Sequence, residues 1–153
     1  MTQDLKTLNA DEMRNWIHQH VPLEDYRGKR VLMIVPDNTR TAPLPVLFPA
    51  LRSLLRPVTK SLDVLVALGT HPPMPQGKIR TMLGIAANDP CADVGLFNHA
   101  WDDPSQLSTI GTLSEAETRE ISDGVLSMEV PVQINRRIHD YDVALVVGPV
   151  FPH

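Results

Sequence analysis

The stretch that decides the fold is VLMIVPDNTR, residues 31–40, in which an unbroken apolar run is followed by four polar residues. A run that is apolar at every position is typical of a strand buried on both faces of a parallel sheet. Ligands of open α/β sheets bind outside the carboxyl ends of the strands. The polar residues after this run therefore fall where a binding site is expected.

Three more apolar runs end at polar residues that can do chemistry. They are Leu62–Leu68 before His71, Val94–Phe97 before His99, and Val143–Val147 before His153. Parallel strands place their carboxyl ends at one edge of a sheet, so the fold should gather five reactive side chains there. These are Asp37, Arg40, His71, His99 and His153.

Helical periodicity occupies residues 10–20, 44–55 and 75–86. Pro49 lies inside the second helix and should kink it or shift its start. Strands that alternate with helices form βαβ units, which predict a parallel sheet. We therefore predict one domain over residues 1–153, a three-layer, Rossmann-like α/β fold with a mostly parallel sheet and helices on both faces.

The segment after the third apolar run follows a different pattern. Residues 108–113 and 129–135 are predicted strands. The second should be half-buried, because its apolar and polar residues alternate, and at an edge, because Pro131 cannot donate a backbone hydrogen bond. Residues 114–128 are compatible with either a helix or a loop.

Composition and charge argue against several classes of protein. Net charge is −4, so there is no basic footprint for nucleic acid or for a membrane surface. No apolar stretch approaches the roughly 18 residues that span a bilayer, and the N-terminus has no secretory apolar region. Cys91 is alone, so no internal disulfide forms, and nothing marks it as a nucleophile. We expect a cytoplasmic protein.

The first polar loop has the donors of an anion site. Arg40 offers a planar fork for carboxylate or phosphate, and Thr39 offers a hydroxyl. Asp37 could orient Arg40 or act on a substrate hydroxyl. The alternative is a helix-capping loop with a surface ion pair, which contributes little.

The histidine loops are candidates for acid–base chemistry. His71 follows Gly69 and precedes two prolines that stiffen its loop, which suits a general acid or base. The alternative is one structural hydrogen bond. His99 could line a pocket or fix a loop, and His153 could be a last residue with no role.

Several common motifs are absent from the sequence. It contains no GxGxxG, GxxxxGK[ST] or GxSxG, and no CxxC or HExxH. The usual signatures of dinucleotide binding, the P-loop, the serine hydrolase elbow and a preformed zinc site are therefore missing.

Five segments, in order, resemble the N-terminal region of the nickel-dependent lactate racemase family. Any one is a weak signal, whereas five in the family's order are fairly specific. They are DNTRTAP at 37–43, ALGTHPPM at 67–74, Asn98-His99 with Trp101-Asp102, VQINR at 132–136, and GPVFPH at 148–153.

The resemblance implies a two-domain α/β enzyme with a nickel-pincer nucleotide that takes a hydride from the α-carbon of a 2-hydroxy acid and returns it. It implies that His71 and His153 are the acid–base pair and that Arg40 binds substrate. It implies that Asp37 supports the loop, and that Asp37, Thr39 and Arg40 contact the cofactor.

The sequence also departs from the family pattern. The family's glycine-rich segment, with the lysine that bonds the cofactor, and its nickel-ligating histidine have no counterpart here. The resemblance thus implies that these residues are the N-terminal part of a longer enzyme. This part would lack the C-terminal domain and would have no metal ligand of its own. We expect the 153 residues alone to be inactive.

Two other functions stay open. One is a metal-dependent hydrolase or lyase half-site, in which three histidines act with one of two carboxylates: His71, His99 and His153 with Asp102 or Asp103. The other is a non-catalytic domain that binds small molecules, or that dimerises through its exposed cleft surface.

Overall fold

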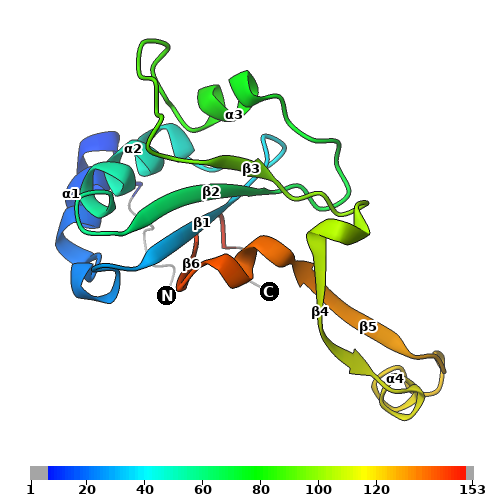
Figure 1. The fold of residues 1–153 in the computed structure, drawn as a ribbon. Helices are drawn as coiled ribbons and strands as arrows, with labels where there is room; N and C mark the ends of the chain where they lie inside the picture. The colour runs from blue at the N-terminus through cyan, green and yellow to red at the C-terminus, as the bar shows by residue number, and fades with distance from the viewer. Residues whose placement is uncertain (1–6, 151–153) are drawn as a thin grey trace.

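The computed structural model describes residues 7–150, and its centre is a four-stranded parallel sheet (Figure 1). The strand order is β3-β2-β1-β6. The strands are β1 (Arg30–Pro36), β2 (Ser61–Ala67), β3 (Leu96–Asn98) and β6 (Val143–Val146). The predicted α/β class with a parallel sheet is confirmed.

The strand register brings the polar loops to one edge. Pro36 pairs with Ala67 at the last position of β1 and β2. On the other side of β1, Ile34 pairs with Val146, the last residue of β6. Three loops therefore leave the sheet within about two residues of the same level, as the sequence predicted.

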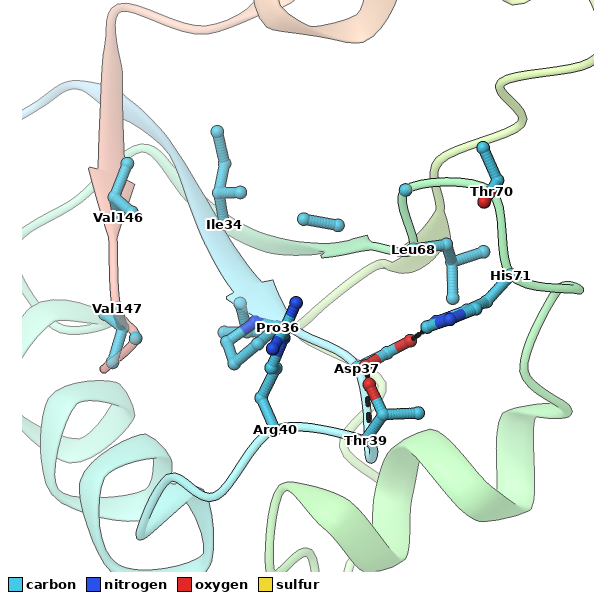
Figure 2. A pocket seen from close by; sticks show the side chains of 14 residues that line it. Ile34, Pro36, Asp37, Thr39, Arg40, Leu68, Thr70, His71, Val146 and Val147 are labelled. Carbon is cyan, nitrogen blue, oxygen red and sulfur yellow. Dashed lines mark hydrogen bonds and ion pairs between the residues drawn. The ribbon is translucent and has the colours of Figure 1, made fainter. Parts of the chain in front are cut away.

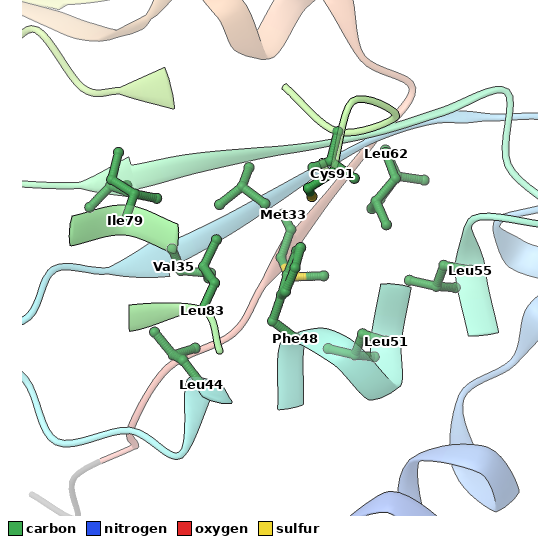
Figure 3. Packing of buried hydrophobic residues seen from close by; sticks show 14 of the residues in the cluster. Met33, Val35, Leu44, Phe48, Leu51, Leu55, Leu62, Ile79, Leu83 and Cys91 are labelled. Carbon is green, nitrogen blue, oxygen red and sulfur yellow. The ribbon is translucent and has the colours of Figure 1, made fainter. Parts of the chain in front are cut away.

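Three helices, α1 (Ala10–His20), α2 (Leu44–Leu55) and α3 (Gln76–Met82), pack on one face of the sheet (Figure 1). Alternate residues of β1 and β2 meet these helices in a single core (Figure 3). Its largest fully buried side chains include Phe48, Met33, Leu55 and Ile79. Burying one such side chain stabilises the fold by about 1.5–3 kcal/mol.

The helix boundaries follow local chemistry. Asn9 caps α1, because its Oδ1 accepts from the backbone N–H groups of Asp11 and Glu12, both at 3.0 Å. Helix α2 continues through Pro49 over its predicted span. The prediction for α3 was too long, since the helix ends at Met82 and Gly84 follows with φ +68°.

The second face of the sheet is covered differently. Leu32 and Leu65 are buried there. Above β3, the 3-10 helix η3 (Arg136–Asp140) places the Arg137 guanidinium 3.7 Å from the centre of the Phe97 ring. Towards the edge strand β6 the cover ends, and Val146 is 73% exposed. Among residues 7–150, this face thus carries a 3-10 helix where the other face carries α-helices.

An arm projects from the sheet (Figure 1). Strands β4 (Leu107–Leu113) and β5 (Val130–Asn135) pair antiparallel in a separate two-stranded sheet, with α4 (Glu115–Ile121) at its tip. Ser114 caps α4 in a capping box with Glu117. The segment left open between helix and loop therefore begins as a short helix.

The prediction that β5 is half-buried holds in part, and its place at an edge is confirmed. Of its three alternating apolar residues, Val130 and Ile134 are half-buried and Val132 is exposed. The strand pairs with β4 alone, in a sheet separate from the main one, so its side chains do not reach the main core. Two short 3-10 turns complete the described elements, η1 (Leu23–Asp25) and η2 (Pro104–Gln106). Within the described chain, no helix is long and apolar enough to cross a membrane.

Gly84 fixes the approach of α3 to α2, which gives a test of the packing. A Cβ on Gly84 would lie 2.6 Å from Cα of Pro45, whereas a Cβ on Gly28, at a similar φ of +70°, would meet nothing within 4 Å. We expect Gly28→Ala to lower the free energy of unfolding by about 1–2 kcal/mol through backbone strain. Gly84→Ala should lower the free energy of unfolding by ~1–3 kcal/mol more than Gly28→Ala does, because its Cβ also overpacks against Pro45.

Urea unfolding of both variants measures the difference. Equal losses in the two variants would show that the Gly84–Pro45 contact relaxes at no cost.

Candidate functional site

A cavity of about 420 Å³ opens at the carboxyl ends of β1, β2 and β6 (Figure 2). Its walls are partly apolar and come from the ends of the strands and the following loops. The apolar members include Ile34, Leu68, Val146 and Val147. Asp37, Thr39, Arg40 and His71 also line it, so the structure brings four of the five residues predicted for catalysis or cofactor binding into one cavity.

Asp37 is a buried carboxylate with both oxygens in use. Its side chain is 5% exposed. Oδ1 accepts from the backbone N–H of Thr39 at 3.0 Å and from the Thr39 hydroxyl at 2.6 Å. Oδ2 accepts from Nδ1 of His71 at 2.5 Å. Burial opposes ionisation, but these hydrogen bonds outweigh it and hold the pKa of Asp37 below its ordinary value.

His71 is held by the turn that follows β2. Gly69 has φ +60°, a conformation that glycine adopts without strain, and the N–H of His71 donates to the carbonyl of Leu68 at 3.1 Å. Because an ionised carboxylate only accepts, Nδ1 of His71 carries the hydrogen in the bond to Asp37. In the neutral imidazole Nε2 is then a free proton acceptor, on a side chain that is 53% exposed.

Arg40 has an unpartnered guanidinium within residues 7–150. Each of the other arginines in that range meets a carboxylate, a carbonyl oxygen, a hydroxyl or an aromatic ring. Figure 2 shows Arg40 beside Pro36, with Asp37 between it and His71. Asp37 therefore pairs with His71 and Thr39, and the Arg40 fork is available to an anion from outside the described chain.

Asn98 and His99 act as anchors in this structure. The Asn98 amide donates to the carbonyl of Met74 at 2.9 Å and accepts from its N–H at 3.0 Å, which fixes the far end of the His71 loop. Nδ1 of His99 lies 3.0 Å from the amide nitrogen of Asn135, at the base of the arm. The amide oxygen of Asn135 is already engaged by the N–H of Arg137, so His99 accepts in this bond.

Three further candidates, Asp102, Asp103 and Cys91, do not line the cavity. Asp103 caps the 3-10 turn through Ser105, and Asp102 is exposed. Cys91 is buried, and burial raises the pKa of its thiol, as suits an inert side chain. His153 lies outside the described residues, although Gly148, near the start of its segment, lines the cavity. Within residues 7–150, no three His, Cys, Asp or Glu side chains are grouped as metal ligands.

The sequence patterns did not predict the contact between Asp37 and His71. The two residues are 34 positions apart. The signal that could have found it is the pairing of two neighbouring parallel strands, each followed directly by its polar loop.

The described residues combine a parallel sheet with a carboxylate-held imidazole and an unpaired guanidinium at its carboxyl edge, an arrangement typical of sites for small anionic molecules. The model of the lactate racemase N-terminal domain matches residues 13–153, and the chain belongs to this family. No curated protein gives a significant match.

A solved structure has a similar fold over most of this chain. The chain is similar to a protein from Thermotoga maritima whose crystal structure is known, with 29% sequence identity and a TM-score of 0.77. The match covers 91% of this chain and 33% of that one, so the chain spans about a third of that relative's length.

The Asp37 hydrogen bonds predict a pH-dependent contribution to stability. Because its pKa is lower in the folded protein, Asp37 stabilises the fold above the ordinary value of about 3.9, and this contribution is lost as pH falls below it. We expect Asp37→Asn to lower the free energy of unfolding at pH 7 by about 1–3 kcal/mol. The difference from the unsubstituted protein should shrink below about pH 4.

Urea unfolding at neutral and acidic pH tests this, with Asp102→Asn as the exposed control. A deficit in Asp37→Asn that stays constant with pH would contradict the assignment of charge to Asp37.

Proposed function

We propose that this chain supplies the substrate-binding and acid–base part of a racemase or epimerase that acts on a 2-hydroxy acid. The observation that carries the proposal is the hydrogen-bonded Asp37–His71 pair, which lines one cavity with the unpartnered Arg40. A 2-hydroxy acid presents a carboxylate and a neighbouring hydroxyl. A guanidinium and a base in one cavity match these two groups.

Each residue has a role that follows from its contacts. Arg40 binds the substrate carboxylate through two parallel N–H donors. His71 takes the proton of the substrate hydroxyl on Nε2, while its Nδ1–H stays bonded to Asp37. Asp37 is a positioning residue, since it orients the imidazole and stabilises the imidazolium that proton transfer creates. Ile34, Leu68 and Val147 keep water from the reacting groups.

The cavity also fits the organic part of the cofactor that the family is known to use. It has a size typical of small-molecule sites, a free cation and apolar walls. We infer that Thr39 and Arg40 would hold a nickel-pincer nucleotide, with Asp37 behind them. When bound, that group would supply the hydride acceptor. By resemblance, His153 is the acid–base partner for the other enantiomer.

Lactate binding tests the role of Arg40. Both D- and L-lactate should bind the purified chain, and Arg40→Gln should lower the affinity about tenfold or more, because a charged hydrogen bond is lost. His71→Gln should change it less, since His71 acts on the hydroxyl. Arg14→Gln, an exposed arginine on α1, is the matched control.

Calorimetry measures all four proteins. If Arg40→Gln and Arg14→Gln bind lactate equally well, Arg40 is not the carboxylate site.

A second test concerns turnover and metal. The purified 153 residues are expected not to interconvert D- and L-lactate, because the lysine that bonds the cofactor has no counterpart in this sequence. Chiral chromatography after incubation, with metal analysis of the same sample, checks this. Turnover would contradict the expectation. One tightly held zinc per chain would favour the metal-dependent hydrolase or lyase instead.

A further inference from the structure

The loop that carries His71 is held differently at its two ends. At the near end, Gly69 has φ +60°, and the N–H of His71 donates to the carbonyl of Leu68 at 3.1 Å. A glycine leaves the backbone free to pivot there. The His71 side chain is half exposed, so packing holds the imidazole only weakly. The direction of the ring toward Asp37, which Figure 2 shows, therefore depends on the far end of the loop.

The far end is stiff, and Asn98 fixes it. Pro72 and Pro73 follow His71. A proline ring locks φ, so a movement beyond the two prolines reaches His71 instead of being absorbed between them. The next residue, Met74, is buried, and it exchanges two hydrogen bonds with the Asn98 side chain. Its N–H donates to Oδ1 at 3.0 Å, and its carbonyl accepts from Nδ2 at 2.9 Å.

Asn98 ends a strand that has few ladder bonds of its own. Strand β3 has three residues, and within residues 7–150 it pairs with β2 alone. Contacts from the base of the arm also hold it. The Arg137 guanidinium lies against the Phe97 ring, and the buried Asn135 donates to Nδ1 of His99 at 3.0 Å. The arm base thus helps to hold β3, and β3 holds the His71 loop.

We propose that Asn98 is a positioning residue for His71, and that His99 extends this control to the base of the arm. Asn98 does not line the cavity, and it acts through Met74. When the far end of the loop is released, the imidazole pivots at Gly69 and loses the hydrogen bond from its Nδ1 to Asp37. The use of this imidazole in acid–base chemistry, unlike its positioning, rests on the proposed function.

Nuclear magnetic resonance of the full chain tests the role of Asn98, because ring nitrogen shifts show which imidazole nitrogen carries the proton. His71 should be the Nδ1–H tautomer, with a downfield proton signal from its bond to a carboxylate. Asn98→Ala should lose this signal. Asn98→Asp still accepts from the Met74 N–H and should keep part of it. Gln76→Ala is the matched control, because Gln76 bonds the Leu96 carbonyl of the same strand at 3.0 Å but lies beyond Met74.

A pair of histidine variants tests the extension to the arm. His99→Phe keeps a ring and removes the acceptor for Asn135, so the His71 signal should weaken. His139→Phe removes the other histidine contact at the arm base, in which Nε2 lies 3.1 Å from the Ser108 hydroxyl, and should leave the signal unchanged. Urea unfolding checks that each variant is folded under the conditions of the spectra.

The outcomes separate this positioning role from the proposed function. If Asn98→Ala and Asn98→Asp keep the Nδ1–H signal as fully as Gln76→Ala does, Asn98 does not position His71. If His99→Phe and His139→Phe give equal signals, the arm base has no part in it. If the signal depends on Asn98 while calorimetry shows no lactate binding, the positioning role stands and the proposed function fails.

Discussion

The structure of the site depends on one buried carboxylate. A charge in the interior is stable only when hydrogen-bond donors surround it. Asp37 obtains these donors from two places, its own loop through Thr39 and the loop after β2 through His71. The bond between Asp37 and His71 therefore ties two βα loops together, and the same bond sets which imidazole nitrogen is free.

The position of Asp37 was predictable from sequence, and its partner was not. Continuous apolar runs identified β1 and β2 as buried parallel strands, and the parallel arrangement placed their loops at one edge. The sequence offered Arg40, three residues away, as the partner of Asp37. In the structure the partner of Asp37 is His71, because β1 and β2 end at the same level and the loops that follow them lie side by side.

Other differences between prediction and structure come either from a local backbone conformation or from contacts between residues far apart in the sequence. The end of α3 depends on the left-handed Gly84, which periodicity ignores. The alternation in β5 predicted one buried face, but alternation does not say which partner a strand has, and Val132 is exposed. The roles of Asn98 and His99 as anchors depend on Met74 and Asn135, which the sequence places far away. The differences at β5, Asn98 and His99 concern tertiary contacts, the difference at α3 concerns the local backbone, and none concerns the class of fold.

The arm is a separable module. At its base the arm contacts the rest of the described chain through Asn135, which bonds to His99, and through Ser108, whose hydroxyl lies 3.1 Å from Nε2 of His139. Its helix buries Thr118 alone. Six of the large apolar residues that are exposed in the described chain belong to it: Ile110, Ile121, Val125, Leu126, Met128 and Val132. Because none of its residues belongs to the main core, a change in the length of this segment leaves the packing of the helices on the sheet untouched.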